Sequence, residues 1–197
     1  MKYNLQMKKY FFLFLVLLFS VNFIKAQESI NKNILVLVEG DYNLTSYSSA
    51  QGRELVQLLG HFKTTVTIKG VNAYSAHELD KFDYTFYVGF SPKDGIPPEF
   101  TQDVINTAKP IIWINNGFID FCKKQDVEKR YGFYVNQIDS LSNYNTVKTE
   151  SFLYAKGFPS INIVQISNKK TVEVWATSIS SKTKKQVPYM VKSGNLV

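Results

Sequence analysis

Short, largely apolar runs alternate with helix-like segments in the first part of the chain. The runs Ile34–Val38, Tyr84–Val88 and Ile111–Ile114 each stop at a polar or glycine-containing turn, and Thr64–Lys69 adds a fourth run rich in β-branched residues. Five consecutive apolar residues at Ile34–Val38, three of them β-branched, are typical of a strand buried on both faces. The pattern predicts a parallel α/β sheet, which binds ligands just beyond the carboxyl ends of its strands.

Helices are expected between these strands. The first would be capped by Ser48 or Ser49, would bury Leu55, Leu58 and Leu59, and would end at Gly60. Three more are predicted: a short helix from Ser75, which has the capping-box spacing to Glu78, a helix beginning at Pro97-Pro98, and one at Phe118–Lys124. The resulting order of strands and helices is that of a doubly wound α/β unit.

The pattern changes after about residue 125. The β-rich segments there are Gly132–Val135, Phe152–Ala155, Ile161–Ile166, Thr171–Thr177 and Val187–Val191, without an amphipathic helix between them. Such spacing predicts antiparallel hairpins, whereas the polar stretch Ser140–Thr149 is expected to be a loop. We therefore predict a single α/β domain over residues 34–197, with a doubly wound core at 34–125 and a β-rich extension at 126–197.

Residues 1–26 have the layout of a secretory signal peptide. Lys2, Lys8 and Lys9 precede an apolar stretch, and Ala26 provides a small residue before the expected cleavage point. Residues 27–33 form a polar linker. Cleavage near Ala26 would place the protein in the periplasm or outside the cell, and an uncleaved segment would instead be a membrane anchor. Removing the four lysines of this segment lowers the net charge from +7 to +3, so the basic character does not indicate a nucleic-acid-binding protein.

Polar residues in the three strand-end turns are the candidate ligand-binding residues. They are Glu39, Asp41 and Tyr42 after Ile34–Val38, Ser91 after Tyr84–Val88, and Asn115 and Asn116 after Ile111–Ile114. The functional interpretation is a contact to a sugar hydroxyl or a metal at the sheet's carboxyl edge. The alternative is a tight turn in which Gly40 supplies the backbone freedom and Asp41 bonds locally.

The sequence contains no complete catalytic set. Cys122, the only cysteine, falls inside a predicted helix and is expected to be a buried structural thiol. His61 and His77 are expected at the surface, and no zinc-type spacing of ligands is present. The absence of a G-x-G-x-x-G fingerprint, a P-loop and an aromatic stacking platform disfavours nucleotides and nucleic acids as ligands. We expect no cofactor and no metal.

Four segments together resemble a known arrangement. They are Ile34–Gly40, Asp83–Gly89, Lys109–Asn115, and Val187–Val191 with Ser193–Asn195. They look like the N-terminal region of exported bacterial polysaccharide deacetylase-like proteins of uncharacterised function, in which a domain similar to class I glutamine amidotransferases precedes a deacetylase-like domain. The resemblance implies a flavodoxin-like α/β sheet with an antiparallel extension.

The resemblance implies a function without catalysis. Asn115-Asn116-Gly117 stands where an amidotransferase has its cysteine, and the metal-binding residues of a deacetylase-like domain have no counterpart before Val197. We therefore expect an accessory or binding domain, truncated or split from its deacetylase-like partner, that contacts a glycan or that partner domain. The alternatives are a small exported hydrolase built on Glu39, Asp41 and Ser91, and a nonfunctional fragment.

Overall fold

The structure is a computed structural model that describes residues 31–90, 95–157 and 160–197. Within it, Lys32–Val197 forms one compact unit. The predicted signal peptide and Ser91 lie outside the described residues. In the part of the chain that the structure covers, no helix is both long enough and apolar enough to cross a membrane.

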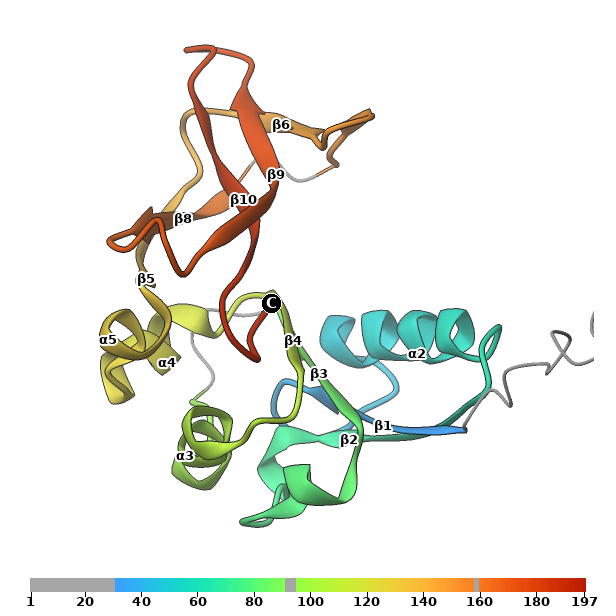
Figure 1. The fold of residues 1–197 in the computed structure, drawn as a ribbon. Coiled ribbons are helices and arrows are strands. Elements are labelled where there is room, and N and C mark those ends of the chain that lie inside the picture. Colours follow the sequence, from blue (N-terminus) through green and yellow to red (C-terminus); the bar gives the residue numbers. More distant parts are fainter. Residues whose placement is uncertain (1–30, 91–94, 158–159) are drawn as a thin grey trace, which may run out of the picture. The chain divides into compact units, whose positions relative to one another are not determined.

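A parallel sheet forms the first half of this unit, as predicted. Its four strands, in the order β2-β1-β3-β4 (Figure 1), are β1 (Lys32–Val38), β2 (Thr64–Gly70), β3 (Tyr84–Gly89) and β4 (Ile111–Asn115). All three strand pairs are parallel. β1 is central, and its residues from Ile34 to Val38 are buried on both faces of the sheet.

The outer edge of β4 is covered by the segment Asn195–Val197. The Ile111 N–H donates to the Asn195 carbonyl at 2.8 Å, and the Trp113 N–H donates to the Val197 carbonyl at 2.7 Å. The Val197 N–H returns a bond to the Ile111 carbonyl at 2.9 Å, and Leu196 is fully buried in a parallel bridge with Ile111. Among the described residues, these bonds leave β2 as the open edge of the parallel sheet.

Helices connect the strands, with differences from the prediction at two of them. The helices are α2 (Tyr47–Leu59), α3 (Pro98–Asn106), α4 (Phe118–Lys124) and α5 (Val127–Tyr131), with 3-10 turns η1 (Val71–Ala73) and η2 (Glu78–Lys81) between β2 and β3. The prediction that Ser48 or Ser49 caps α2 was wrong, because Ser46 is the N-cap and its hydroxyl accepts from the Ser49 N–H. Leu58 is 62% exposed rather than buried, since Leu55 and Leu59 already cover the sheet.

The helix predicted from Ser75 is replaced by the short turn η2. The Glu78 carboxylate accepts a bond from the Ser75 N–H at 3.1 Å, as in a capping box, but His77 adopts a left-handed conformation with φ of 62° and prevents a regular first turn. The second crossover of the sheet is therefore made without an α-helix.

Each face of the parallel sheet has its own core. Ile34, Val36 and Val38 face α2, where Gly52 permits close packing because an added Cβ would lie 2.5 Å from Val38 Cγ1. Leu35 and Leu37 belong to the larger core on the other face. In that core Trp113 is surrounded by aromatic rings at centroid distances of 4.4–5.9 Å, from Tyr87, Phe100, Phe118 and Phe121.

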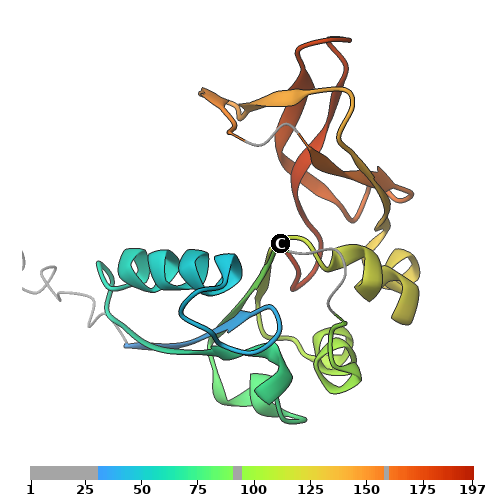
Figure 2. The same ribbon diagram turned by 180° about the vertical axis from the view of Figure 1, so that it is seen from behind.

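Antiparallel strands make up the second half of the unit (Figure 2). β5 (Phe133–Asp139) pairs with β8 (Ile161–Ile166), and a four-stranded sheet has the order β10-β9-β6-β7. Its strands are β6 (Tyr144–Lys148), β7 (Leu153–Ala155), β9 (Glu173–Ser180) and β10 (Gln186–Lys192). The prediction of a loop over Ser140–Thr149 was wrong, because Tyr144 and Val147 bury their side chains and give that polar stretch a strand.

Candidate functional site

Glu39 joins the ends of two neighbouring strands at the carboxyl edge of the parallel sheet. Its side chain is 6% exposed, and Oε2 accepts a bond from the Phe90 N–H, just after β3, at 2.6 Å. The Glu39 N–H in turn donates to the Val88 carbonyl at 3.0 Å. A carboxylate held by a backbone donor is a strong acceptor, so Glu39 fixes the shape of this edge from below its surface.

Asp41 and Tyr42 lie on the surface of the turn that follows Glu39. Gly40 adopts a left-handed conformation with φ of 66°, and the Asn72 N–H donates to its carbonyl at 3.1 Å. The turn lies against the end of β2, where a Cβ on Gly70 would come within 2.4 Å of the Tyr42 nitrogen. Both exposed side chains are thus carried by a turn that is fixed from two sides.

Asn115 ends β4 in a left-handed conformation with φ of 67°. Asparagine tolerates this conformation better than most residues because its short polar side chain bonds locally. Its Nδ2 donates to Gln51 Oε1 on α2 at 3.0 Å, and its carbonyl accepts from Asn162 Nδ2 on β8 at 2.9 Å. Three amide side chains from distant parts of the sequence therefore meet at the end of this strand.

Asn116 closes the turn between β4 and α4 against the end of β3. Its Nδ2 donates to the Phe90 carbonyl, and its own carbonyl accepts from Trp113 Nε1 at 3.0 Å. Gly89 allows this approach, since a Cβ there would lie 2.2 Å from the Asn116 carbonyl oxygen. Gly117, with φ of 88°, then starts α4. The side chain of Asn116 therefore positions the turn.

Two stacked aromatic rings lie next to these polar groups. Tyr47, the first residue of α2, and Phe90 have centroids 4.8 Å apart and planes inclined by 17°. They are 71% and 36% exposed, respectively. The sequence does not predict this pair, and its one signal is the position of Phe90 directly after the glycine that ends β3.

The structure thus brings five of the six predicted residues to one edge and divides them by role, while the sixth, Ser91, lies outside the described residues. Glu39 and Asn116 bind backbone groups of neighbouring strands, whereas Asp41, Tyr42 and Asn115 are exposed. No protein-family model matches this chain, and no curated protein matches it either. A function must therefore be argued from the geometry of the chain itself.

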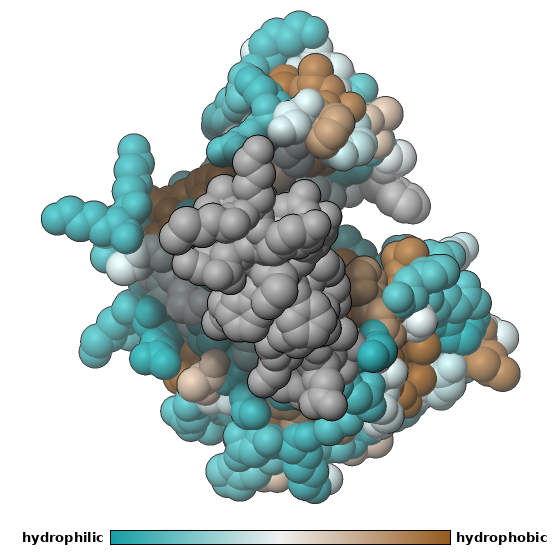
Figure 3. Space-filling view, turned by 45° about the vertical axis from the view of Figure 1, so that its right-hand side comes forward, coloured by the Kyte–Doolittle hydropathy of each residue, from teal (hydrophilic) through white to brown (hydrophobic). Residues whose placement is uncertain are grey.

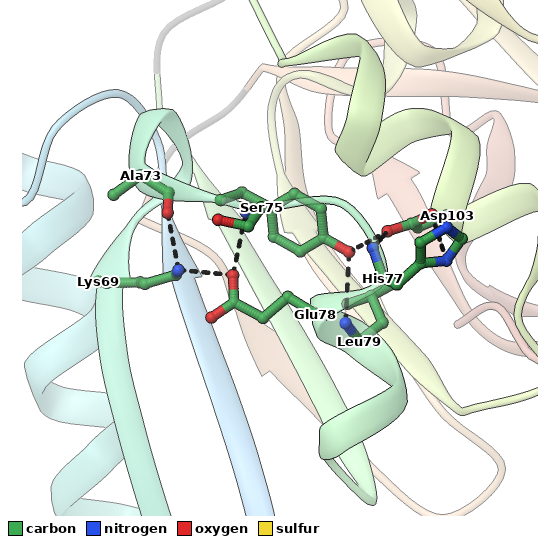
Figure 4. Close-up of polar contacts among 8 residues, drawn as sticks. Lys69, Ala73, Ser75, His77, Glu78, Leu79 and Asp103 are labelled. Carbon is green, nitrogen blue, oxygen red and sulfur yellow. Dashed lines mark hydrogen bonds and ion pairs between the residues drawn. The ribbon is translucent and has the colours of Figure 1, made fainter.

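A second polar cluster lies between η2 and α3 (Figure 4). Asp103 is 8% exposed, and its Oδ2 accepts from the Tyr74 hydroxyl and from the His77 N–H, each at 2.5 Å. Burial, followed by the bond to Asp103, raises the pKa of Tyr74. Ser75 lies on the Glu78 side of the cluster, away from the His77 ring, so these residues do not form a serine–histidine–aspartate triad. They hold the irregular crossover in place.

Cys122 borders an open hollow of about 500 Å³ between α4 and β5. Its Sγ accepts from the Val135 N–H at 3.4 Å, and burial raises the pKa of the thiol to about 11. The thiolate is the reactive form of cysteine, so a thiol with this pKa is a poor nucleophile at neutral pH. Among the described residues, no group of three histidine, cysteine, aspartate or glutamate side chains is placed to hold a metal ion.

Proposed function

We propose that this chain is a noncatalytic carbohydrate-binding domain whose binding site is the carboxyl edge of the parallel sheet. The observation that carries the proposal is the exposed, stacked pair of Tyr47 and Phe90 beside the amide side chains of Asn115 and Gln51. A pyranose ring has an apolar face of C–H bonds and a rim of hydroxyl groups. Aromatic rings fit the face, and amide and carboxylate groups exchange hydrogen bonds with the rim.

Backbone bonds fix this edge, which favours binding with little loss of entropy. Glu39 and Asn116 each bond to the backbone of Phe90, so the aromatic ring is presented from a fixed position. Exposed Asp41 and Tyr42, on the turn after β1, supply further polar groups and a third aromatic ring. The predicted contacts to a glycan thus come from the residues that remain accessible.

The turn after β4 supports a role without catalysis. Asn115 has the left-handed conformation that a nucleophile has on a sharp strand-to-helix turn, but an amide is not a nucleophile. We propose a flavodoxin-like sheet related to the amidotransferase-like domains that the sequence resembles, supported by the strand order β2-β1-β3-β4 and by the three crossovers that join its strands in chain order. We further propose that the domain acts in an exported, polysaccharide deacetylase-like system.

The proposal is tested by titrating the purified chain with neutral oligosaccharides of glucose, xylose and N-acetylglucosamine in a calorimeter. We expect saturable binding of at least one of them, and Tyr47→Ala and Asn115→Ala should each weaken it about tenfold or more, equivalent to ~1.4 kcal/mol. Phe62→Ala is the matched control, because Phe62 is 69% exposed and follows the opposite end of α2.

Two results would overturn the proposal. The first is an absence of binding to every oligosaccharide, or an equal loss of affinity in the Phe62→Ala control. The second is hydrolysis of an acetylated glycan or of glutamine by the purified chain, because an enzyme would need a catalytic group that the proposed site does not contain.

A further inference from the structure

Two aromatic residues occupy bulges in the antiparallel pair formed by β9 and β10. The pairing passes from Pro188 opposite Thr177 to Met190 opposite Ala176, and so skips Tyr189. It then passes to Val191 opposite Val174, and so skips Trp175 on the other strand. A bulge leaves one residue out of the ladder and re-aims its side chain. Tyr189 and Trp175 are accordingly 39% and 45% exposed, at positions set by the irregular register.

Each of these rings has a lysine ammonium over it. Lys192 Nζ lies 5.5 Å from the centroid of Trp175, and Lys156 Nζ lies 5.2 Å from the centroid of Tyr189. Lys156 is held there by a bond of 2.6 Å from its ammonium to the Ser160 carbonyl. A cation over an aromatic ring is stabilised by the quadrupole of the ring. The two pairs therefore present an apolar ring and a positive charge together.

The part of the chain that forms this sheet and its connecting turns carries an excess of lysine. Residues 144–192 contain eight lysines and two acidic residues, whereas residues 32–143 contain eleven basic and thirteen acidic residues. The positive charge of the chain beyond residue 31 is thus concentrated in the part that forms β6 to β10. Figure 3 shows hydrophobic and hydrophilic side chains next to one another over this upper part of the molecule. A surface of this kind attracts polyanions, and the attraction decreases as salt screens it.

We infer that the sheet β10-β9-β6-β7 binds an acidic polysaccharide, whose sugar rings pack against the exposed parts of Trp175 and Tyr189 and whose carboxylates contact the adjacent lysines. The excess of lysine over residues 144–192 selects a polyanion. Each aromatic ring with its neighbouring ammonium favours a polyanion built of saturated rings, because the C–H face of such a ring contacts the aromatic side chain and its acidic group contacts the lysine. A single-stranded nucleic acid is the competing polyanion, because its bases also stack on exposed aromatic rings, and the test therefore includes one.

This inference is independent of the proposed binding at the carboxyl edge of the parallel sheet. It rests on other residues and on a charged rather than a neutral ligand. The two proposals can therefore fail separately, and their variants distinguish them.

The test uses calorimetric titration of the purified chain with polygalacturonate as the acidic polysaccharide. Dextran serves as a neutral sugar polymer, polyglutamate as an acidic polymer without sugar rings, and an oligo-dT strand as a nucleic acid. We expect polygalacturonate to bind more tightly than all three, with an affinity that falls as salt is raised. Trp175→Ala and Tyr189→Ala should each weaken this binding about tenfold, whereas Trp175→Phe and Tyr189→Phe should keep most of it.

Charge variants and controls complete the design. Lys192→Gln should weaken polygalacturonate binding and reduce its salt dependence, while Phe62→Ala should leave both unchanged. Far-UV circular dichroism checks that each variant is folded, and the phenylalanine variants keep the test valid if an alanine variant unfolds. The inference is overturned if polyglutamate or oligo-dT binds as tightly as polygalacturonate. It is also overturned if removal of either ring leaves the affinity unchanged, or if Asn115→Ala abolishes the binding and Trp175→Ala does not.

Discussion

Replacing Gly89 by alanine should distort the carboxyl edge of the parallel sheet from within. Gly89 ends β3, and an added Cβ would lie 2.2 Å from the carbonyl oxygen of Asn116 and 2.7 Å from its carbonyl carbon. A carbon and a carbonyl oxygen normally approach to about 3.3 Å. The Asn116 carbonyl would therefore move by about 1 Å, because both clashing atoms belong to the backbone.

The loss of stability depends on the hydrogen bond that the Asn116 carbonyl accepts. It accepts the bond from Trp113 Nε1 at 3.0 Å, and the loss of such a bond costs about 1 kcal/mol. Overpacking adds about 1–3 kcal/mol, and the lower chain entropy of unfolded alanine returns about 0.4–1 kcal/mol. We expect a net loss of roughly 1.5–3 kcal/mol in the free energy of unfolding.

Urea denaturation measures this loss, since the midpoint falls in proportion when the slope is unchanged. Tryptophan emission provides a local signal, because the displaced carbonyl is the partner of the Trp113 indole. Gly95→Ala is the matched control, as an added Cβ at Gly95 has no atom within 4 Å. Equal stability of the two variants within about 0.5 kcal/mol, the usual range of a surface substitution, would contradict the predicted clash at Gly89.

Three further predictions concern other parts of the fold. Ser46→Ala should lower the free energy of unfolding by ~1 kcal/mol in urea, because it removes the N-cap of α2; an unchanged midpoint would contradict this. Tyr74→Phe should cost about 1–3 kcal/mol by leaving Asp103 with one donor fewer, whereas Tyr84→Phe, at an exposed site, should cost little. The folded-state pKa of Tyr74 is raised above its ordinary value of 10.0. The stability that the protonated hydroxyl contributes is therefore present below pH 10 and is lost as the pH rises beyond it. Tyr74→Phe should make the free energy of unfolding decrease less steeply in this alkaline range. Cys122 should react slowly with a disulfide reagent at pH 8 in the native protein and rapidly in urea, since its pKa is about 11; equal rates would show that the thiol is accessible.

The sequence predicted the elements whose own composition decides their structure. Ile34–Val38 is apolar throughout and three of its five residues are β-branched, so burial on both faces follows from the residues alone. Pro97-Pro98 marks the start of α3 for an equally local reason. Tyr144–Lys148 was missed because its strand depends on partners in β7 and β9, which a polar stretch does not reveal.

The position of the candidate site could be predicted from the sequence, but the contacts between its side chains could not. The turns after β1 and β4 were expected at the sheet's carboxyl edge, and the structure places Glu39, Asp41 and Asn115 there. That Asn115 bonds to Gln51 and Asn162 depends on contacts between residues 64 and 47 positions apart. Such contacts leave no periodicity in the sequence, and neither does the pairing of Tyr47 with Phe90.

The pairing of Asn195–Val197 with β4 has a consequence for how the chain folds. Asn195 bonds to Lys109 across 86 positions, and all the antiparallel strands lie between them. Loops of this length form slowly, because chain entropy is lost before the contact forms. While the chain is being synthesised, the bare edge of β4 is open to other strands for as long as residues 116–194 are being made. The parallel sheet is therefore synthesised before the antiparallel strands, but its last edge closes only after them.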